Sequence, residues 1–262
     1  MNFTRAIVRP PGRNFACGVT SAAEGAPDYE RALHQHARYC DALSACGLEL
    51  TRLSAEDAYP DGTFVEDAAV VAARGAIVTR PGAPTRTGEI ESVARALARF
   101  FQPGLRHIDA PGTVDGGDVC EADGHFFIGV SARTNEPGAL QLKRHLESIG
   151  HSASLVDIRA SRTLLHLKTG IAYLGEGVWA VAEALMRDLQ PLERFGIRHL
   201  IPVRPGEGYA ANCVRVNDRV LVASGYPGIA AELDRLGLRP LPLDMSEYRK
   251  MDGGLSCLSL RF

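Results

Sequence analysis

Residues 113–129, TVDGGDVCEADGHFFIG, decide the fold of this chain, because two apolar runs flank a polar turn within them. Asp123 and Gly124 separate the runs, and an Asp-Gly pair between apolar runs predicts a β-hairpin. The carboxylates of Asp115 and Asp118 stand directly before the first run. The stretch therefore predicts a hairpin that carries acidic groups at its start.

The same pattern recurs along the chain at a regular interval. Hairpin starts fall near Val65, Asp115, His166, Asn212 and Gly254, at spacings of 50, 51, 46 and 42 residues. A period near 50 residues is typical of repeats arranged radially around an axis. The sequence therefore predicts a ring of similar units.

Amphipathic segments follow the hairpins and predict helices over residues 27–47, 88–101, 137–150 and 227–237, with a weaker candidate over 181–192. A short lone strand follows each helix, so the unit reads hairpin, helix, strand. The last unit, residues 254–262, is truncated. We expect the opening strand, residues 6–9, to complete it, so that residues 1–262 form one closed domain.

Composition narrows the class of protein. The 262 residues are 45% hydrophobic and 23% charged, and the net charge of −2 argues against a nucleic-acid-binding protein. No apolar run reaches 18 residues, so we expect no transmembrane helix, and residues 1–5 lack a signal-peptide pattern, so we expect a cytoplasmic protein. In a chain of this length the six cysteines indicate reduced thiols, and without a CxxC pair a structural zinc site is not expected.

Polar residues gather where the hairpins begin. Equivalent strand starts converge on the axis of a radial repeat, so one cavity would collect several carboxylates, a histidine and a cysteine, a composition suited to a cation. The residues concerned are Asp61, Glu66, Asp67, Asp115, Asp118, His166, Asn212 and Cys257.

Each of these groups also has a purely structural interpretation. The residues around Asp115 could form only a turn, and Glu66 with Asp67 could be a solvated strand start. His166, between two leucines, could be a packed core histidine, and Cys257 an inert buried thiol. Their common position in the repeat favours the functional interpretation.

Five motifs resemble the dimethylarginine dimethylaminohydrolases of the guanidino-modifying superfamily. They are FVED (64–67), TVDGGD (113–118), SARTN (131–135), HLKT (166–169) and DGGLSC (252–257), and the resemblance runs in the same order from residue 5 to 262. It implies a five-bladed α/β-propeller of ββαβ units with pseudo-fivefold symmetry. It also implies a hydrolase acting on C–N bonds in linear amidines, which converts N-ω-methylated L-arginine to L-citrulline and methylamine or dimethylamine.

The resemblance implies the catalytic roles as well. Cys257 would attack the guanidinium carbon to form a covalent S-alkylthiouronium intermediate. His166 would protonate the leaving amine and then accept a proton from water. Asp115 matches the carboxylate that orients the histidine, a position at which some family members have Glu. A bound guanidinium should favour the thiolate form of Cys257, so the free enzyme is expected to keep a largely protonated thiol.

The remaining site residues match the substrate-binding positions of the family. Glu66 and Asp67 match the carboxylates that hold the guanidinium. Asp61 matches the carboxylate that binds the α-amine, with the backbone carbonyls of Val19 and Met251 nearby. Residues 14–20 would form a lid.

Two arginines, Arg86 and Arg133, match the pair that binds the substrate α-carboxylate, since guanidinium groups suit a planar anion. The resemblance implies a small-molecule substrate, no nucleic-acid or membrane partner, and a monomer or homodimer. No metal or other cofactor is expected, although a Cys/His pair in a polar pocket could bind Zn²⁺ as an inhibitor.

Three other functions remain open from the sequence. An arginine deiminase uses related chemistry but usually carries an added helical domain. An amidinotransferase would pass the amidino group to an amine, and such chains are typically longer. A non-catalytic guanidine-binding module would need no nucleophile, so Cys257, His166 and Asp115 argue against it.

Overall fold

The computed structural model describes residues 2–161, 164–185, 196–204 and 206–262. Five three-stranded sheets form in this part of the chain, and in each the first pair of strands is antiparallel and the second parallel. The sheets are β3 (Ala69–Ala72), β4 (Gly75–Val78), β5 (Leu105–His107); β6 (Val119–Ala122), β7 (His125–Val130), β8 (Ser152–Asp157); β9 (Ile171–Tyr173), β10 (Val178–Ala182), β11 (His199–Val203); β12 (Val214–Val216), β13 (Arg219–Ala223), β14 (Pro240–Leu243); and β15 (Leu260–Arg261), β1 (Arg5–Val8), β2 (Glu49–Arg52). This confirms the predicted α/β-propeller of ββαβ units.

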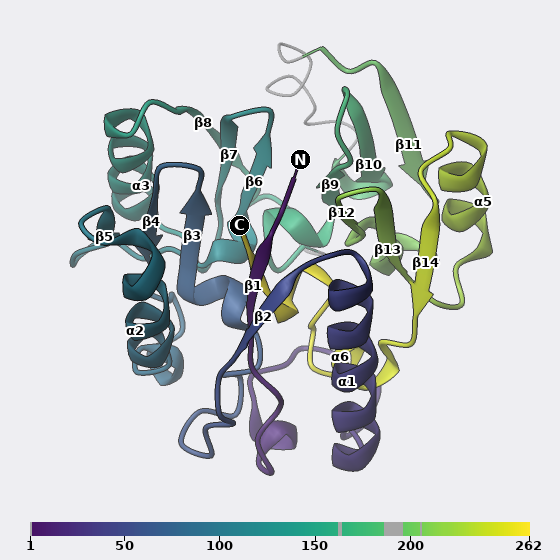
Figure 1. The fold of residues 1–262 in the computed structure, drawn as a ribbon, viewed down its shortest axis with the longest axis horizontal. Coiled ribbons are helices and arrows are strands. Elements are labelled where there is room, and N and C mark those ends of the chain that lie inside the picture. Colours follow the sequence, from purple (N-terminus) through teal and green to yellow (C-terminus); the bar gives the residue numbers. More distant parts are fainter. Residues whose placement is uncertain (1, 162–163, 186–195, 205) are drawn as a thin grey trace.

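The four strongly predicted helices are confirmed and cross from the second strand to the third strand of a sheet. They are α1 (Tyr29–Ala45), α2 (Ile90–Phe101), α3 (Glu136–Ser148) and α5 (Pro227–Arg235). Each lies on the outside of the molecule (Figure 1). In α2, Val93 and Leu97 are fully buried and pack with Ile7 of β1. The apolar residues of this segment therefore mark the face of α2 that packs against the core.

The ring closes through the two ends of the chain, as expected. Strand β1 pairs antiparallel with β15, where Ile7 faces Leu260, and parallel with β2, where Ile7 faces Thr51. The C-terminal residues therefore lie beside β1 (Figure 1). The truncated fifth unit is completed by the N-terminal strand.

The predicted hairpin starts are wrong in one respect, because each first strand is preceded by a short 3-10 helix. These turns are η2 (Val65–Ala68), η4 (Gly116–Asp118), η5 (Leu167–Thr169), η7 (Gly208–Ala211) and η8 (Ser256–Leu258). The backbone there leaves the sheet and satisfies its donors with local bonds, such as Asp118 N to the Asp115 carbonyl at 3.0 Å. The polar motifs therefore lie on or beside 3-10 turns.

The weaker helix predicted over residues 181–192 is not found in its described part. Val181 pairs with Ile171 and Pro202 as the second last residue of β10, and η6 (Glu183–Leu185) follows. The β-branched Val178 and Val181 favour this central strand over a helix. The remaining positions, 186–192, lie outside the described residues.

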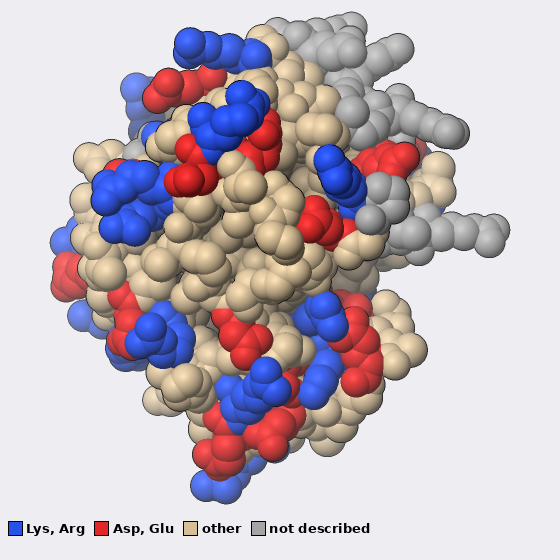
Figure 2. Space-filling model, turned by 90° about the vertical axis from the view of Figure 1, so that its right-hand side faces the viewer, with Lys and Arg blue, Asp and Glu red and all other residues tan. Residues whose placement is uncertain are grey.

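The remaining short elements are η1 (Phe15–Cys17), η3 (Pro84–Arg86) and α6 (Ser246–Arg249). None of the helices in the described ranges has the length and apolar character needed to span a membrane. On the face in Figure 2, the described acidic and basic side chains are interspersed.

Close backbone contact between neighbouring turns brings the repeats together. A Cβ atom on Gly116 of η4 would lie 2.0 Å from the carbonyl oxygen of Glu66 on η2 and 3.0 Å from that of Ala69. Only glycine fits where one turn meets the next.

We expect Gly116→Ala to lower the free energy of unfolding by about 1–3 kcal/mol, because a methyl group forced against backbone cannot be absorbed by a rotamer change. Thermal unfolding checks this. Gly208→Ala is the matched control, since nothing lies within 4 Å of a Cβ there. Equal melting temperatures for the two variants would contradict the proposed contact.

Candidate active site

A small cavity near the axis brings together eight of the ten residues that the sequence predicted for the site. Its volume is about 20 Å³, about that needed for one water molecule. The predicted residues lining it are Val19, Asp61, Asp67, Arg86, Arg133, His166, Met251 and Cys257. Asp115 lies behind His166, and Glu66 lines a neighbouring cavity.

Cys257 lies on η8 and is half-buried. Its Sγ lies 3.4 Å from the backbone N–H of Gly254, which donates to it. Burial, together with the negative charges of Glu66 and Asp67, raises the pKa of Cys257 to about 12. The thiol is therefore protonated at neutral pH, as predicted for the free protein.

His166 immediately precedes η5, and its ring is oriented by one carboxylate. Its Nε2 lies 3.0 Å from Oδ2 of Asp115, which is fully buried and whose Oδ1 accepts a bond from Gly82 N at 2.8 Å. Burial alone would lower the pKa of His166, but Asp67, the bond to Asp115 and the charge of Asp118 raise it to about 9. The imidazolium is thus the stable form and can donate a proton.

Asp67 stays ionised because it is surrounded by donors. Its Oδ2 accepts from Arg86 Nη1 at 2.6 Å, and its Oδ1 accepts from Gly117 N at 2.9 Å. Burial opposes ionisation, but His166 and Arg86 outweigh it and lower the pKa of Asp67 to about 2. A fixed negative charge therefore faces the cavity.

The two arginines differ in how many of their N–H donors remain free to bind a ligand. Arg86 donates to Asp67, to both oxygens of Glu89 and to the Phe64 carbonyl, so most of its donors are used. Arg133 Nη1 is buried and has no hydrogen-bond partner among the described residues. Arg133 therefore presents the free donor at this end of the cavity.

A buried carboxylate joins the Arg133 loop to the histidine turn. Asp118 Oδ2 accepts from Ser131 Oγ at 2.6 Å and Thr134 Oγ1 at 2.7 Å, while Oδ1 accepts from Leu167 N at 2.9 Å. Burial raises the pKa of Asp118 despite these bonds. The second aspartate of the TVDGGD motif thus has a positioning role.

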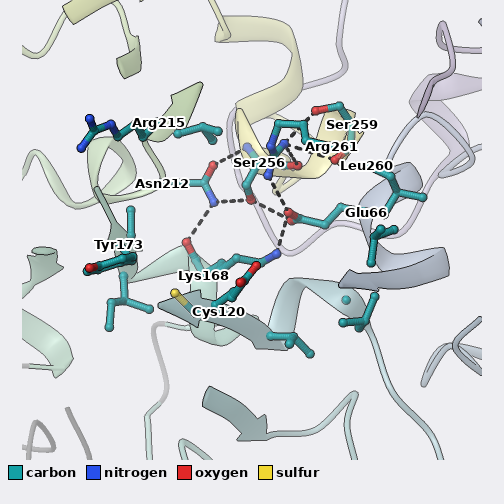
Figure 3. A pocket seen from close by; sticks show the side chains of 18 of the residues that line it. Glu66, Cys120, Lys168, Tyr173, Asn212, Arg215, Ser256, Ser259, Leu260 and Arg261 are labelled. Atoms are coloured by element: carbon teal, nitrogen blue, oxygen red, sulfur yellow. Dashed lines mark hydrogen bonds and ion pairs between the residues drawn. The ribbon is translucent and has the colours of Figure 1, made fainter. Parts of the chain in front are cut away.

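Glu66 does not line this cavity but a second one of about 30 Å³, which His166 and Cys257 also line. Its Oε1 accepts from Lys168 Nζ at 2.6 Å, and its Oε2 accepts from Ser256 Oγ at 2.7 Å. Figure 3 shows this group from the axial cavity of about 140 Å³, which Glu66, Lys168 and Ser256 also line. These side chains separate the axial cavity from the site.

The predicted lid contacts the site through Val19, which lines the cavity, and two carboxylates hold this segment and the residue after it. Val19 N donates to both carboxylate oxygens of Asp61 at 3.1 Å, and Ser21 N donates to Asp252 Oδ2 at 2.6 Å. Burial raises the pKa of Asp61, with Arg86 opposing it. Val19 and Asp61 both line the cavity, so the bonds between them tie the predicted lid to the site.

Four further residues line the cavity that were not predicted for the site: Phe64, Leu165, Asp252 and Gly253. Leu165 and Asp252 adjoin the predicted His166 and Met251. Phe64 and Gly253 each lie two residues from a predicted residue. Asp252 adopts a left-handed conformation with φ +55°, which is uncommon outside glycine. The Asp-Gly-Gly run shortly before Cys257 was the feature of the sequence that could have indicated these residues of the site.

The oxygens of Asp67 and Asp115 and a nitrogen of His166 lie within 4.8 Å of one another, a spacing at which three ligands can hold a metal ion. Asp67 and Asp115, together with Asp118, raise the pKa of His166. A neutral thiol, an imidazolium and a fixed carboxylate thus share one small space, and such a set can stabilise a bound cation and exchange protons with it.

The fold and this site define the chain as a member of the guanidino-modifying superfamily. No family model matches it. It is similar to the N(G),N(G)-dimethylarginine dimethylaminohydrolase of Pseudomonas aeruginosa, at 43% identity over 99% of this chain and 100% of the relative. It is also similar to that of Streptomyces coelicolor, at 36% identity over 98% and 96%.

The structure of a cysteine-to-serine variant of the Pseudomonas enzyme in complex with citrulline matches this fold with a TM-score of 0.94, at 42% identity over 100% of both chains. The chain belongs to the dimethylarginine dimethylaminohydrolase family.

The raised pKa of His166 predicts a pH-dependent stability. A histidine whose folded pKa of about 9 exceeds its ordinary 6.5 stabilises the fold fully below pH 6.5 and loses that contribution as the pH rises through 9. We therefore expect the difference in melting temperature between the wild type and His166→Gln to shrink over this range. A difference that is constant from pH 6 to about 9.5 would contradict the ion pair.

Proposed function

We propose that this protein hydrolyses N-ω-methylated L-arginine, both dimethylarginine and monomethylarginine, to L-citrulline and dimethylamine or methylamine. The observation that carries the proposal is one cavity that holds Cys257 and His166, with Asp67 on one side and the unpaired Arg133 donor on another. This polarity fits a free amino acid with a cationic side chain. The family relatives named above act on such a substrate by name.

In the first half of the reaction, the Cys257 thiolate attacks the guanidinium carbon and a C–S bond forms. The C–N bond to the methylated nitrogen breaks, and His166 donates a proton to the departing amine. The intermediate is an S-alkylthiouronium. In the second half, water attacks the same carbon, His166 accepts its proton, and the C–S bond breaks to release citrulline and the thiolate.

The charges around the thiol give this scheme its physical basis. Glu66 and Asp67 help keep Cys257 protonated while no cation is bound. A guanidinium beside these carboxylates offsets their charge and lowers the pKa of the thiol, which then releases its proton to solvent while His166 stays protonated. The thiolate therefore forms when the substrate binds. The guanidinium carbon of the substrate is then already oriented against the sulfur.

The amino-acid end of the substrate is assigned to the other predicted residues. Asp61 would bind the α-amine together with the Val19 and Met251 carbonyls, after the Val19 N–H releases its carboxylate. Arg133 would bind the α-carboxylate with its free Nη1, and Arg86 would contribute the donors not used by Asp67 and Glu89. The lid closes over both groups.

The reaction as written needs no metal or other cofactor, and its partner is a small molecule. We propose that Zn²⁺ acts only as an inhibitor, and that residues 1–262 work as one catalytic domain in a monomer or homodimer. All six cysteines are free thiols, which supports a reducing compartment and hence the cytoplasm.

Incubation with asymmetric dimethylarginine should yield citrulline and dimethylamine in equal amounts, and Cys257→Ser should abolish both because the covalent step is lost. Colorimetric citrulline and chromatographic amine assays measure this. Cys46→Ser, at the distant end of α1, is the matched control and should retain activity. Comparable turnover of plain arginine would instead indicate a deiminase, and no citrulline from either would contradict the proposal.

Arg133→Gln should raise KM for dimethylarginine about 10- to 100-fold, the effect of losing a hydrogen bond to a charged group, with a smaller change in kcat. Steady-state kinetics check this. Arg144→Gln, at an exposed position of α3, is the control. An unchanged KM for Arg133→Gln would remove Arg133 from the carboxylate site.

A further inference from the structure

Asn212 is the polar residue at the start of the fourth repeat, and the proposed reaction gives it no task. It follows η7 and is buried, with 7% of its surface exposed. The other four repeats carry Glu66, Asp115, His166 and Cys257 on or directly beside the corresponding turns. A buried amide at this level of the ring calls for a physical explanation.

The amide of Asn212 connects the turn of the nucleophile to the turn of the histidine. Its Oδ1 accepts from Ser256 N at 2.9 Å, beside Cys257. Its Nδ2 donates to the Lys168 carbonyl at 2.9 Å, two residues after His166, and to Ser256 Oγ at 3.0 Å. One side chain thus contacts the backbone of both catalytic turns.

These bonds form part of a closed ring of interactions (Figure 3). Ser256 Oγ donates to Glu66 Oε2, and Glu66 Oε1 accepts from Lys168 Nζ, so the path returns to the residue whose carbonyl Asn212 binds. Four of the five repeats contribute to it. Because the bonds share partners, a shift of one turn is resisted by all of them.

Only an amide meets the demands of this position. It accepts from one backbone N–H and donates twice, to a carbonyl and to a hydroxyl oxygen. An ionised carboxylate cannot donate, and a hydroxyl has only one proton to donate. The nucleophile loop also lies directly against it, since a Cβ on Gly254 would be 2.4 Å from Asn212 Oδ1.

We propose that Asn212 is a positioning residue that sets the location of Cys257 relative to His166. It acts through Ser256 and Lys168 and does not touch the reacting atoms. The role deepens the proposed hydrolase function and rests on it. Asp61 and Arg133, which bind the amino-acid end of the substrate, lie on other loops, so the loss of Asn212 should affect the chemical step far more than substrate binding.

Asn212→Ala should lower kcat for dimethylarginine about 100-fold, as expected when reacting groups move by about 1 Å, while KM stays near the wild-type value. The loosened turn should also let iodoacetamide alkylate Cys257 several-fold faster relative to the exposed Cys17, measured by mass spectrometry of the separated peptides.

Asn217→Gly provides the matched control. Asn217 lies in the same repeat and also makes three hydrogen bonds, to Phe3 N, Phe3 O and Cys46 O, and its φ of +54° suits glycine. It should lose stability as Asn212→Ala does but keep kcat and the alkylation ratio. Wild-type kcat in Asn212→Ala, or an equal loss of kcat in Asn217→Gly, would overturn the proposal.

Two further arms keep the test decisive. If Asn212→Ala does not fold, Asn212→Asp keeps the volume and the acceptor but loses the donors, and a wild-type kcat in that variant would overturn the role. If the wild type makes no citrulline from any methylated arginine, the proposed function fails. The alkylation ratio then decides the positioning role by itself, since a faster reaction of Cys257 supports it and an unchanged one overturns it.

Discussion

The contact between neighbouring 3-10 turns around the axis is the constraint on which the rest of this structure depends. Gly116 meets the backbone of Glu66 at a distance that only glycine allows, and Gly254 lies close against the side-chain amide of Asn212. Because the turns touch, residues about 50 positions apart in sequence share one cavity. The sheets and helices outside hold these turns against one another through their buried apolar faces.

The electrostatics of the cavity follow from that convergence. Crowded carboxylates keep His166 protonated and Cys257 neutral, the reverse of the ion pair often associated with a reactive cysteine. Activation then depends on the cation that binds, which couples the chemistry to the choice of substrate. Arg86 keeps Asp67 ionised, so a negative charge is always present to interact with the bound cation.

Local patterns made most of the fold predictable. The Asp123–Gly124 turn has positive φ at both residues, as a two-residue hairpin requires, and the apolar stripe of α2 marked its buried face. The 3-10 turns could not be predicted from the sequence. Over four residues, a turn with i to i+3 hydrogen bonds produces no pattern of apolar residues that differs from the start of a strand. The prediction of a helix over 181–192 was wrong in its described part, because Val181 pairs with residues of two neighbouring strands.

The sequence by itself determined the repeat, the closure of the ring by its two ends, and the residue types that meet at the axis, since these depend on short-range periodicity and spacing. Only the tertiary structure decided how those residues share their hydrogen bonds. It separated Glu66 from Asp67, left Arg133 with a free donor while Arg86 was occupied, and joined Asn212 to both catalytic turns. Such contacts join residues 19 to 190 positions apart, and no local pattern encodes which partner a buried polar atom will find.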